Sequence, residues 1–292
     1  MRSLCIFTLV LVAIAVAVVA GCSQQQPAQA TAQPGTSSAA DTVTLVSTPI
    51  GNVLADTNGR TLYYFITDVP HSGASTCYGT CAVIWPVFST DNVIVPASLS
   101  AADFSSITRT DGTKETTYRG WPLYYYQSDS GPGDTKGEGV LNVWYVARPD
   151  YTVMVTDRAA TGSYLTDGLG RTLYFFAKDS NGTSGCTGAC PAKWPPFAPA
   201  SIIAPSLLKV PDFNTISRAD GTPQAAYMGR PLYYFANDTN PGDMNGNGFN
   251  NLWYVANITG VVPATIIPAP TMNPATTVTT VTTAMQPAGG GY

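Results

Sequence analysis

Histidine and charge are the scarcest features of this 292-residue chain. Only 11% of its residues are charged, and its single histidine is His71. The 14 basic residues form no cluster, which argues against nucleic acid as a partner, because phosphate neutralisation dominates such affinity. No stretch after the apolar N-terminus has the spacing of an amphipathic helix. The abundance of Tyr, Gly and Pro indicates instead a turn-rich β protein.

The feature most clearly present is an internal duplication. Residues 54–147 (copy 1) recur at 165–256 (copy 2), at an offset of 111 that falls to 109 after a small gap. A residue found in one copy alone cannot be essential to a chemistry that both copies share. His71 has no counterpart, so we expect an exposed loop residue rather than a member of a catalytic triad or metal site.

The shared acidic residues argue against catalysis. Paired carboxylates on facing strands could serve a glycosidase as acid and nucleophile. Every acidic residue that both copies share, however, lies at a turn or a strand end, namely Asp56, Asp68, Asp103, Asp111, Asp129 and Asp134. A binding or structural unit is also duplicated in tandem more often than a whole active site. We therefore expect that the protein is not an enzyme.

The N-terminus is typical of an exported lipoprotein. Residues 1–21 combine Arg2 with a long apolar run, as a signal peptide does. The residues that end it, Val19 to Cys22, resemble a lipobox, in which the signal is cut before a cysteine that then carries lipid. Acyl chains on Cys22 would hold the protein on the outer side of the membrane, at ~0.8 kcal/mol per buried CH₂. The alternative is a retained membrane anchor.

The segments next to the two ends are predicted to be disordered. Residues 22–41 are mostly Gln, Ala, Ser, Thr and Pro and cannot bury enough apolar area to offset the entropy of ordering, so they predict a flexible tether. Residues 263–292 form a Pro/Thr-rich tail.

Hydrophobic alternation and turn residues predict strands between these ends. Asp56–Gly59 predicts a hairpin from residues 53–55 to 61–66, Arg119–Gly120 predicts a second, and Asp111–Gly112 predicts a further turn. The expected fold is all-β, with two tandem, internally duplicated antiparallel β domains at 42–156 and 157–262, long Gly/Pro-rich loops and disordered tails. A four-bladed propeller shared across the chain is the alternative.

A finer motif, Leu–Tyr–aromatic–aromatic–x–x–Asp, occurs at residues 62–68, 123–129, 173–179 and 232–238. Consecutive aromatic residues point to both faces of a strand, so these strands should be central, and each Asp should shape the turn after its strand. With Cys77-x-Gly79-x-Cys81-x-x-x-Trp85-Pro86 and the Gly-rich segment 132–139, the motif resembles an exported lipoprotein repeat family of unknown function. The resemblance covers both copies and implies secretion, lipid anchoring and no established reaction. In copy 2, Arg230 replaces Trp121.

Four cysteines remain after Cys5 and Cys22, in two Cys-x-Gly-x-Cys pairs formed by Cys77, Cys81, Cys186 and Cys190. Outside the cytoplasm such pairs usually form disulfides, and closing a five-residue loop stabilises a fold by about 2 kcal/mol. Covalent haem would need a histidine beside the second cysteine, where Ala82 and Pro191 stand. We expect structural disulfides; a four-thiolate zinc site and an exchanging redox pair are the alternatives.

The two acidic, glycine-rich loops at residues 129–139 and 238–248 offer oxygen ligands for calcium. The candidates are Asp129, Asp134, Glu138, Asp238, Asp243, Asn245 and Asn247. Lys136 is a poor neighbour for a cation, and Pro-Gly turns closed by Asp would produce the same pattern. We favour turn chemistry and expect no cofactor, with Ca²⁺ as the alternative.

The function expected from these features is that of a lipid-anchored envelope lipoprotein acting as a non-catalytic structural or binding module. Tandem copies would give avidity for a glycan or another cell-envelope polymer, and we expect an exposed Trp121 to be a stacking platform in copy 1 alone. The alternative is an extracytoplasmic redox or electron-transfer accessory that uses the cysteine pairs. The expected partners are the membrane, through the lipid, and an envelope polymer.

Overall fold

The computed structural model describes residues 42–180 and 182–258. The signal peptide at 1–21, Cys22, the tether at 22–41 and the tail at 263–292 lie outside these ranges. Within the ranges, no helix is both long and apolar enough to span a membrane.

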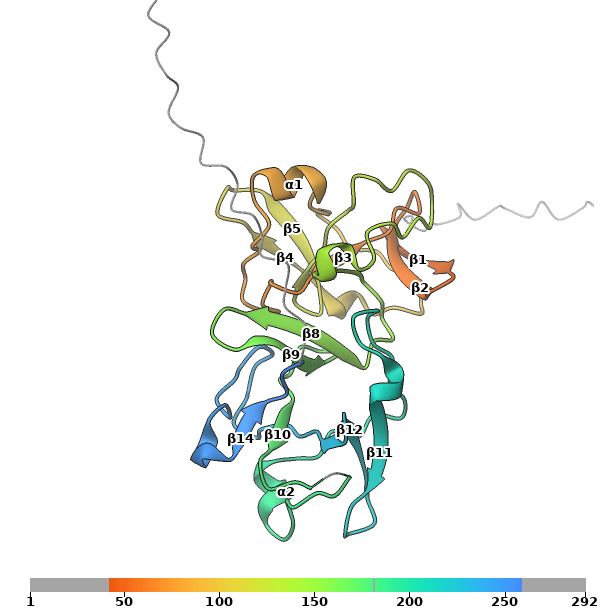
Figure 1. Ribbon diagram of the computed structural model, residues 1–292. Coiled ribbons are helices and arrows are strands. Elements are labelled where there is room, and N and C mark those ends of the chain that lie inside the picture. Colours follow the sequence, from red (N-terminus) through yellow and green to blue (C-terminus); the bar gives the residue numbers. More distant parts are fainter. Residues whose placement is uncertain (1–41, 181, 259–292) are drawn as a thin grey trace, which may run out of the picture. The chain divides into compact units, whose positions relative to one another are not determined.

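Short antiparallel strands make up most of the regular structure (Figure 1). The first half contains β1 (Val43–Thr48), β2 (Gly51–Asp56), β3 (Tyr63–Phe65), β4 (Phe104–Thr108), β5 (Lys114–Tyr118), β6 (Trp121–Pro122) and β7 (Trp144–Val146). The second half repeats them as β8 (Val153–Arg158), β9 (Gly162–Asp167), β10 (Tyr174–Phe176), β11 (Phe213–Ser217), β12 (Pro223–Tyr227), β13 (Arg230–Pro231) and β14 (Trp253–Val255).

The two halves contain the same small sheets. β1 pairs with β2, β3 pairs with β7, and β4, β5 and β6 form a third sheet; β8–β9, β10–β14 and β11–β12–β13 repeat this order. The expected all-β fold of duplicated antiparallel units is confirmed. The division into domains at 42–156 and 157–262 stays a prediction.

The expected turn at Arg119–Gly120 forms a hairpin between β5 and β6, in which Tyr118 lies opposite Trp121. Both turn residues have positive φ, 48° for Arg119 and 79° for Gly120, as tight hairpin turns require. The turn at Asp111–Gly112 likewise joins β4 to β5.

The hairpin expected around Asp56–Gly59 is only partly formed. A single β-bridge from Ala55 to Thr61 extends the turn, but β2 forms its ladder of backbone hydrogen bonds with β1. From Tyr63 onward the chain pairs with β7 on one side and bridges Tyr124 on the other, which leaves no edge for β2.

Short helices appear in segments that show no helical periodicity in the sequence. They are α1 (Thr80–Ile84) and α2 (Cys190–Lys193), each next to a cysteine pair, and the 3₁₀ turns η1 (Ala101–Asp103), η2 (Val140–Asn142), η3 (Val210–Asp212) and η4 (Phe249–Asn251). Segments of three to five residues are too short to show a 3.6-residue periodicity.

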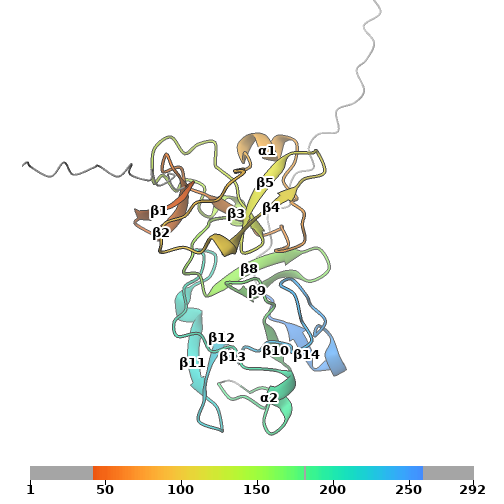
Figure 2. The same cartoon turned by 180° about the vertical axis from the view of Figure 1, so that it is seen from behind.

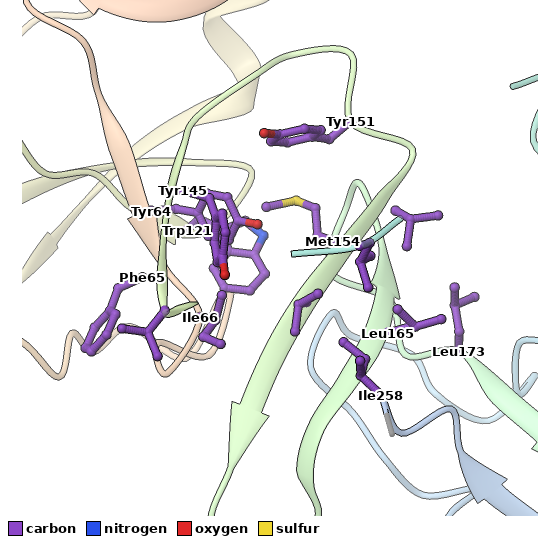
Figure 3. Close-up of a cluster of buried hydrophobic side chains, with 14 of the residues drawn as sticks. Tyr64, Phe65, Ile66, Trp121, Tyr145, Tyr151, Met154, Leu165, Leu173 and Ile258 are labelled. Carbon is purple, nitrogen blue, oxygen red and sulfur yellow. The ribbon is translucent and has the colours of Figure 1, made fainter. Parts of the chain in front are cut away.

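The hairpin that leads into copy 2, β8–β9, lies between the other strands of the two halves in both views (Figures 1 and 2). The Asp157 N–H on β8 donates to the Ile66 carbonyl of copy 1 at 2.7 Å. Figure 3 shows Met154 of β8 between the rings of copy 1 and Leu165 of β9. One hydrophobic cluster therefore takes residues from both copies.

Candidate functional site

The four aromatic-Asp motifs are joined in reciprocal pairs. In copy 1 the Tyr63 hydroxyl donates to Asp129 at 2.7 Å, and the Tyr124 hydroxyl donates to Asp68 at 2.6 Å. Each tyrosine thus bonds the aspartate of the other motif. The backbones of Tyr63 and Tyr124 also exchange hydrogen bonds, at 2.8 and 3.0 Å. Copy 2 repeats the exchange between Tyr174 and Asp238 and between Tyr233 and Asp179.

Each of these aspartates also closes a loop, as the sequence predicts. Their carboxylates accept backbone N–H bonds from residues six to eight positions later, namely Thr76 for Asp68, Lys136 for Asp129, Gly185 for Asp179 and Asn245 for Asp238. Burial raises the pKa of Asp68 to about 6 and raises the pKa of the other three as well. The shared carboxylates are therefore occupied in holding the fold.

The cysteine pairs form the two expected disulfides, Cys77–Cys81 and Cys186–Cys190. The Trp that follows each pair stacks in the core. The ring centres of Trp85 and Trp144 are 3.9 Å apart, and those of Trp194 and Trp253 are 3.7 Å apart. Cys77 and Cys186 are fully buried. The disulfides thus fix the segments that carry these tryptophans.

A buried arginine links each disulfide to the core. In copy 1 Arg109 donates to the Cys77 carbonyl, to the Ser75 hydroxyl and, at 3.0 Å, to Glu115. In copy 2 Arg218 makes the same three contacts, with Cys186, Ser184 and Gln224. The Ser75 hydroxyl lies 2.8 Å from the Tyr124 hydroxyl, which joins this network to Asp68. The acidic residue of copy 1 is therefore replaced by its neutral isostere in copy 2.

The acidic loops use their oxygens for turn closure. Asp134 accepts the N–H groups of Ser130 and Gly131 and a 2.7 Å bond from the Lys136 ammonium. Asp243 accepts the corresponding N–H groups of Thr239 and Asn240, while Glu138 and Asn247 accept the N–H groups of Val146 and Val255. The described residues contain no group of three or more His, Cys, Asp or Glu side chains placed to hold a metal ion. The geometry of these loops is that of closed turns.

The prediction of an exposed Trp121 is wrong. Trp121 is only 2% exposed, and its ring contacts Tyr64 at 5.1 Å. The hairpin β8–β9 covers this part of copy 1, with Met154 of β8 beside Trp121 (Figure 3). A duplicated sequence gives no sign that the second unit supplies a cover for the first.

The equivalent face of copy 2 is open. Trp121 is replaced there by the exposed Arg230, and the buried Ile66 by the exposed Ala177. Tyr254, the counterpart of the fully buried Tyr145, is 43% exposed. Within the described residues no further hairpin follows β14 to cover this surface. We call it the open face, lined by Phe175, Tyr227, Met228, Arg230, Tyr254, Val255 and Asn257.

The open face surrounds a shallow cavity of about 230 Å³. The Arg230 guanidinium carbon lies over the Phe175 ring, 3.9 Å from its centre, so a cation–π pair forms part of the cavity wall. Aromatic rings, a guanidinium and an amide suit the binding of a small polar ring by stacking and hydrogen bonds. The residues that line the cavity include no pair of a nucleophile and a general base.

His71 is an exposed loop residue, as expected, and its N–H donates to the Gly120 carbonyl at 3.1 Å. Arg109, Glu115 and the open face were all missed at the level of sequence. Arg109 recurs as Arg218 in a chain with few charges, and that recurrence was an available signal. The openness of copy 2 left one signal, the replacement of Trp121 by Arg230.

Comparison with known proteins identifies the repeat. A family model described as a secreted repeat of unknown function matches residues 44–89, 105–148, 155–198 and 214–257, together more than half of the chain. Each matched segment contains one aromatic-Asp motif. No curated protein and no solved structure matches. The resemblance noted from the motifs is confirmed.

Proposed function

The chain belongs to this family of secreted repeats, and from that premise we propose that it is a lipid-tethered, non-catalytic binding module of the cell envelope. Secretion places the repeats outside the cytoplasm. The lipid on Cys22 would anchor the chain, and residues 22–41 would carry the folded copies away from the membrane.

The open face of copy 2 is the observation that carries this proposal. Copy 1 buries Trp121 and Tyr145 at this face, whereas copy 2 leaves Tyr254 43% exposed next to the buried rings of Phe175 and Tyr227. A sugar ring has an apolar face that stacks on an aromatic ring and hydroxyls that accept from a guanidinium. The cavity of about 230 Å³ is smaller than a drug-sized site, and one sugar ring of a glycan or envelope polymer suits it.

Binding of purified cell-wall polysaccharide to the mature chain tests the proposal. We expect the polysaccharide to retain the protein, and Tyr254→Ala to weaken retention at least tenfold by removing the stacking ring. Leu141→Ala is the matched control, because Leu141 is also an exposed apolar side chain but lies outside the open face. Equal retention of both variants would contradict the proposal.

The anchor has its own test. Mass spectrometry of the membrane-extracted protein should find residue 22 at the N-terminus with the added mass of acyl chains, and Cys22→Ser should lack that mass. A membrane-bound parent chain that keeps residues 1–21 and carries no acyl mass would favour an uncleaved N-terminal anchor instead. The redox alternative gains no support from Cys77 and Cys186, because both are fully buried.

A further inference from the structure

The buried corner beside each disulfide differs between the copies by one group. Glu115 in copy 1 and Gln224 in copy 2 occupy the same position, and both are fully buried. The arginine bonds each of them in the same way, from Arg109 Nη1 to Glu115 Oε2 and from Arg218 Nη1 to Gln224 Oε1. Arg218 thus shows that a neutral acceptor satisfies the guanidinium at this position.

The two copies differ at the second polar atom of this side chain. Gln224 Nε2 donates to the Leu232 carbonyl at 2.7 Å. Glu115 Oε1 has no hydrogen-bond partner among the described residues. Because Leu123 is the counterpart of Leu232, the equivalence of the two corners makes the Leu123 carbonyl the acceptor expected at this oxygen, and two oxygens without a proton between them repel. The position therefore calls for a donor that an ionised carboxylate cannot supply.

The surrounding charges lead to the same requirement. Among the described residues, Arg109 is the cation that acts on this corner, and it faces Asp68, Asp111, the Tyr124 hydroxyl and Glu115. In copy 2, Arg218 faces Asp179 and Asp220, and Arg230 also acts on Asp179. An ionised Glu115 would give copy 1 one buried negative charge more than its twin, with no added cation.

Hydrogen bonding decides which carboxyl of copy 1 holds the proton. Asp68 accepts from the Thr76 N–H and hydroxyl on one oxygen and from the Tyr124 hydroxyl on the other, so its ionised form is well bonded. Glu115 accepts from Arg109 on Oε2, with the Ser75 hydroxyl also acting on its carboxyl, but its Oε1 has no partner among the described residues. The proton of the pair therefore belongs on Glu115 Oε1.

We propose that Glu115 is protonated in the folded protein and donates from Oε1 to the Leu123 carbonyl, which makes the copy 1 corner a pH-sensitive lock on the Cys77–Cys81 loop. The lock acts through Arg109, which holds both Glu115 and the Cys77 carbonyl. Loss of the proton places a second carboxylate in the corner and loosens the loop, while the Gln224 corner of copy 2 is insensitive.

The direction of the pH effect follows from the pKa of Glu115, which burial raises from its ordinary 4.5 to about 7. The folded chain thus binds this proton more tightly than the unfolded chain. Its contribution to stability is complete below pH 4.5 and is lost as the pH rises to about 7, at about tenfold in the folding constant per pH unit for one proton. Asp68 is raised in the same direction, so the slope belongs to the coupled pair.

Two reciprocal variants of the full mature chain test the proposal, with unfolding measured by denaturant between pH 5 and pH 8. Glu115→Gln should reduce by one the number of protons linked to unfolding, which is the slope of the unfolding free energy against pH. The variant should also be more stable than the parent at pH 8. Gln224→Glu should increase that number by one and lower stability more at pH 8 than at pH 5. Hydrogen exchange at pH 8 should be faster around Cys77 than around Cys186 in the parent and equal in Glu115→Gln.

An infrared measurement reports the proton itself, independently of stability. A carbonyl stretch of a protonated carboxylic acid should be present at pH 6 in the parent and weaker in Glu115→Gln, where the part contributed by Glu115 is lost and only that of Asp68 remains. The proposal is overturned if that band is missing from the parent, or if Glu115→Gln has the same pH slope as the parent.

Discussion

The two copies share a fold and differ in what surrounds it. In copy 1 the rings of Tyr64, Trp121 and Tyr145 are buried under the β8–β9 hairpin. In copy 2 the same positions hold Phe175, Arg230 and Tyr254, and within the described residues they have no such cover. The change from Trp to Arg matches this change of environment. Side chains that recur in both copies therefore report the fold, and those that differ report position in the chain.

The largest effect is expected at the face of copy 1 that β8–β9 covers. Trp121→Arg places the residue of copy 2 into the buried site of copy 1, where an unpaired guanidinium has no partner. We expect a loss of about 3–5 kcal/mol in the free energy of unfolding. Arg230→Trp, the reverse exchange, should change stability by no more than about 1 kcal/mol, because the open face is already exposed. Denaturant titration measures both, and equal losses would contradict the difference between the faces.

The reciprocal tyrosines give the next effect. Tyr124→Phe removes a donor from Asp68, which is fully buried, and we expect a loss of about 1.5–3 kcal/mol. Tyr233→Phe should cost less, because Asp179 is partly exposed and water can replace the hydroxyl. Thermal unfolding of the two variants side by side checks the order. A larger loss for Tyr233→Phe would show that burial does not set the strength of the pair.

The disulfides should be energetically equivalent. Both loops close over a sequence separation of 4 residues, so removal of either pair by Cys→Ser should cost about 2 kcal/mol. Unfolding of Cys77→Ser/Cys81→Ser and of Cys186→Ser/Cys190→Ser provides the comparison at pH 5, where the copy 1 corner holds its proton. A clear difference in the loss of unfolding free energy at that pH would mean that one disulfide stabilises the fold by more than loop closure.

The smallest effect concerns the acidic loops. Lys136 is exposed and pairs with Asp134, whereas copy 2 has Asn245 at that position. Because the Asp134 and Asp243 turns are closed by the same backbone N–H groups, Lys136→Asn should leave the melting temperature unchanged within error. Added Ca²⁺ should leave it unchanged as well. A rise in melting temperature with Ca²⁺ in Lys136→Asn would restore the calcium interpretation of these loops.

Local features of the fold were readable from the sequence, whereas contacts between distant segments were not. The turn at Arg119–Gly120 and the Cys77–Cys81 disulfide depend on residues close in the chain, and both were predicted correctly. The exchange of Tyr63 and Tyr124 hydroxyls between motifs depends on how two strands approach each other, which no local pattern contains. The burial of Trp121 depends on a hairpin more than thirty residues later, so its exposure was predicted wrongly.

The reactivity of two equivalent tyrosines tests the central difference between the copies most directly. Tyr145 and Tyr254 occupy the same place on β7 and β14, fully buried and 43% exposed respectively. Hydroxyl-radical footprinting of the folded mature chain, read by mass spectrometry, should modify Tyr254 readily and leave Tyr145 protected until the protein unfolds. Equal modification of the two rings would mean that β8–β9 does not cover copy 1, or that copy 2 is covered as well, and would contradict the open face.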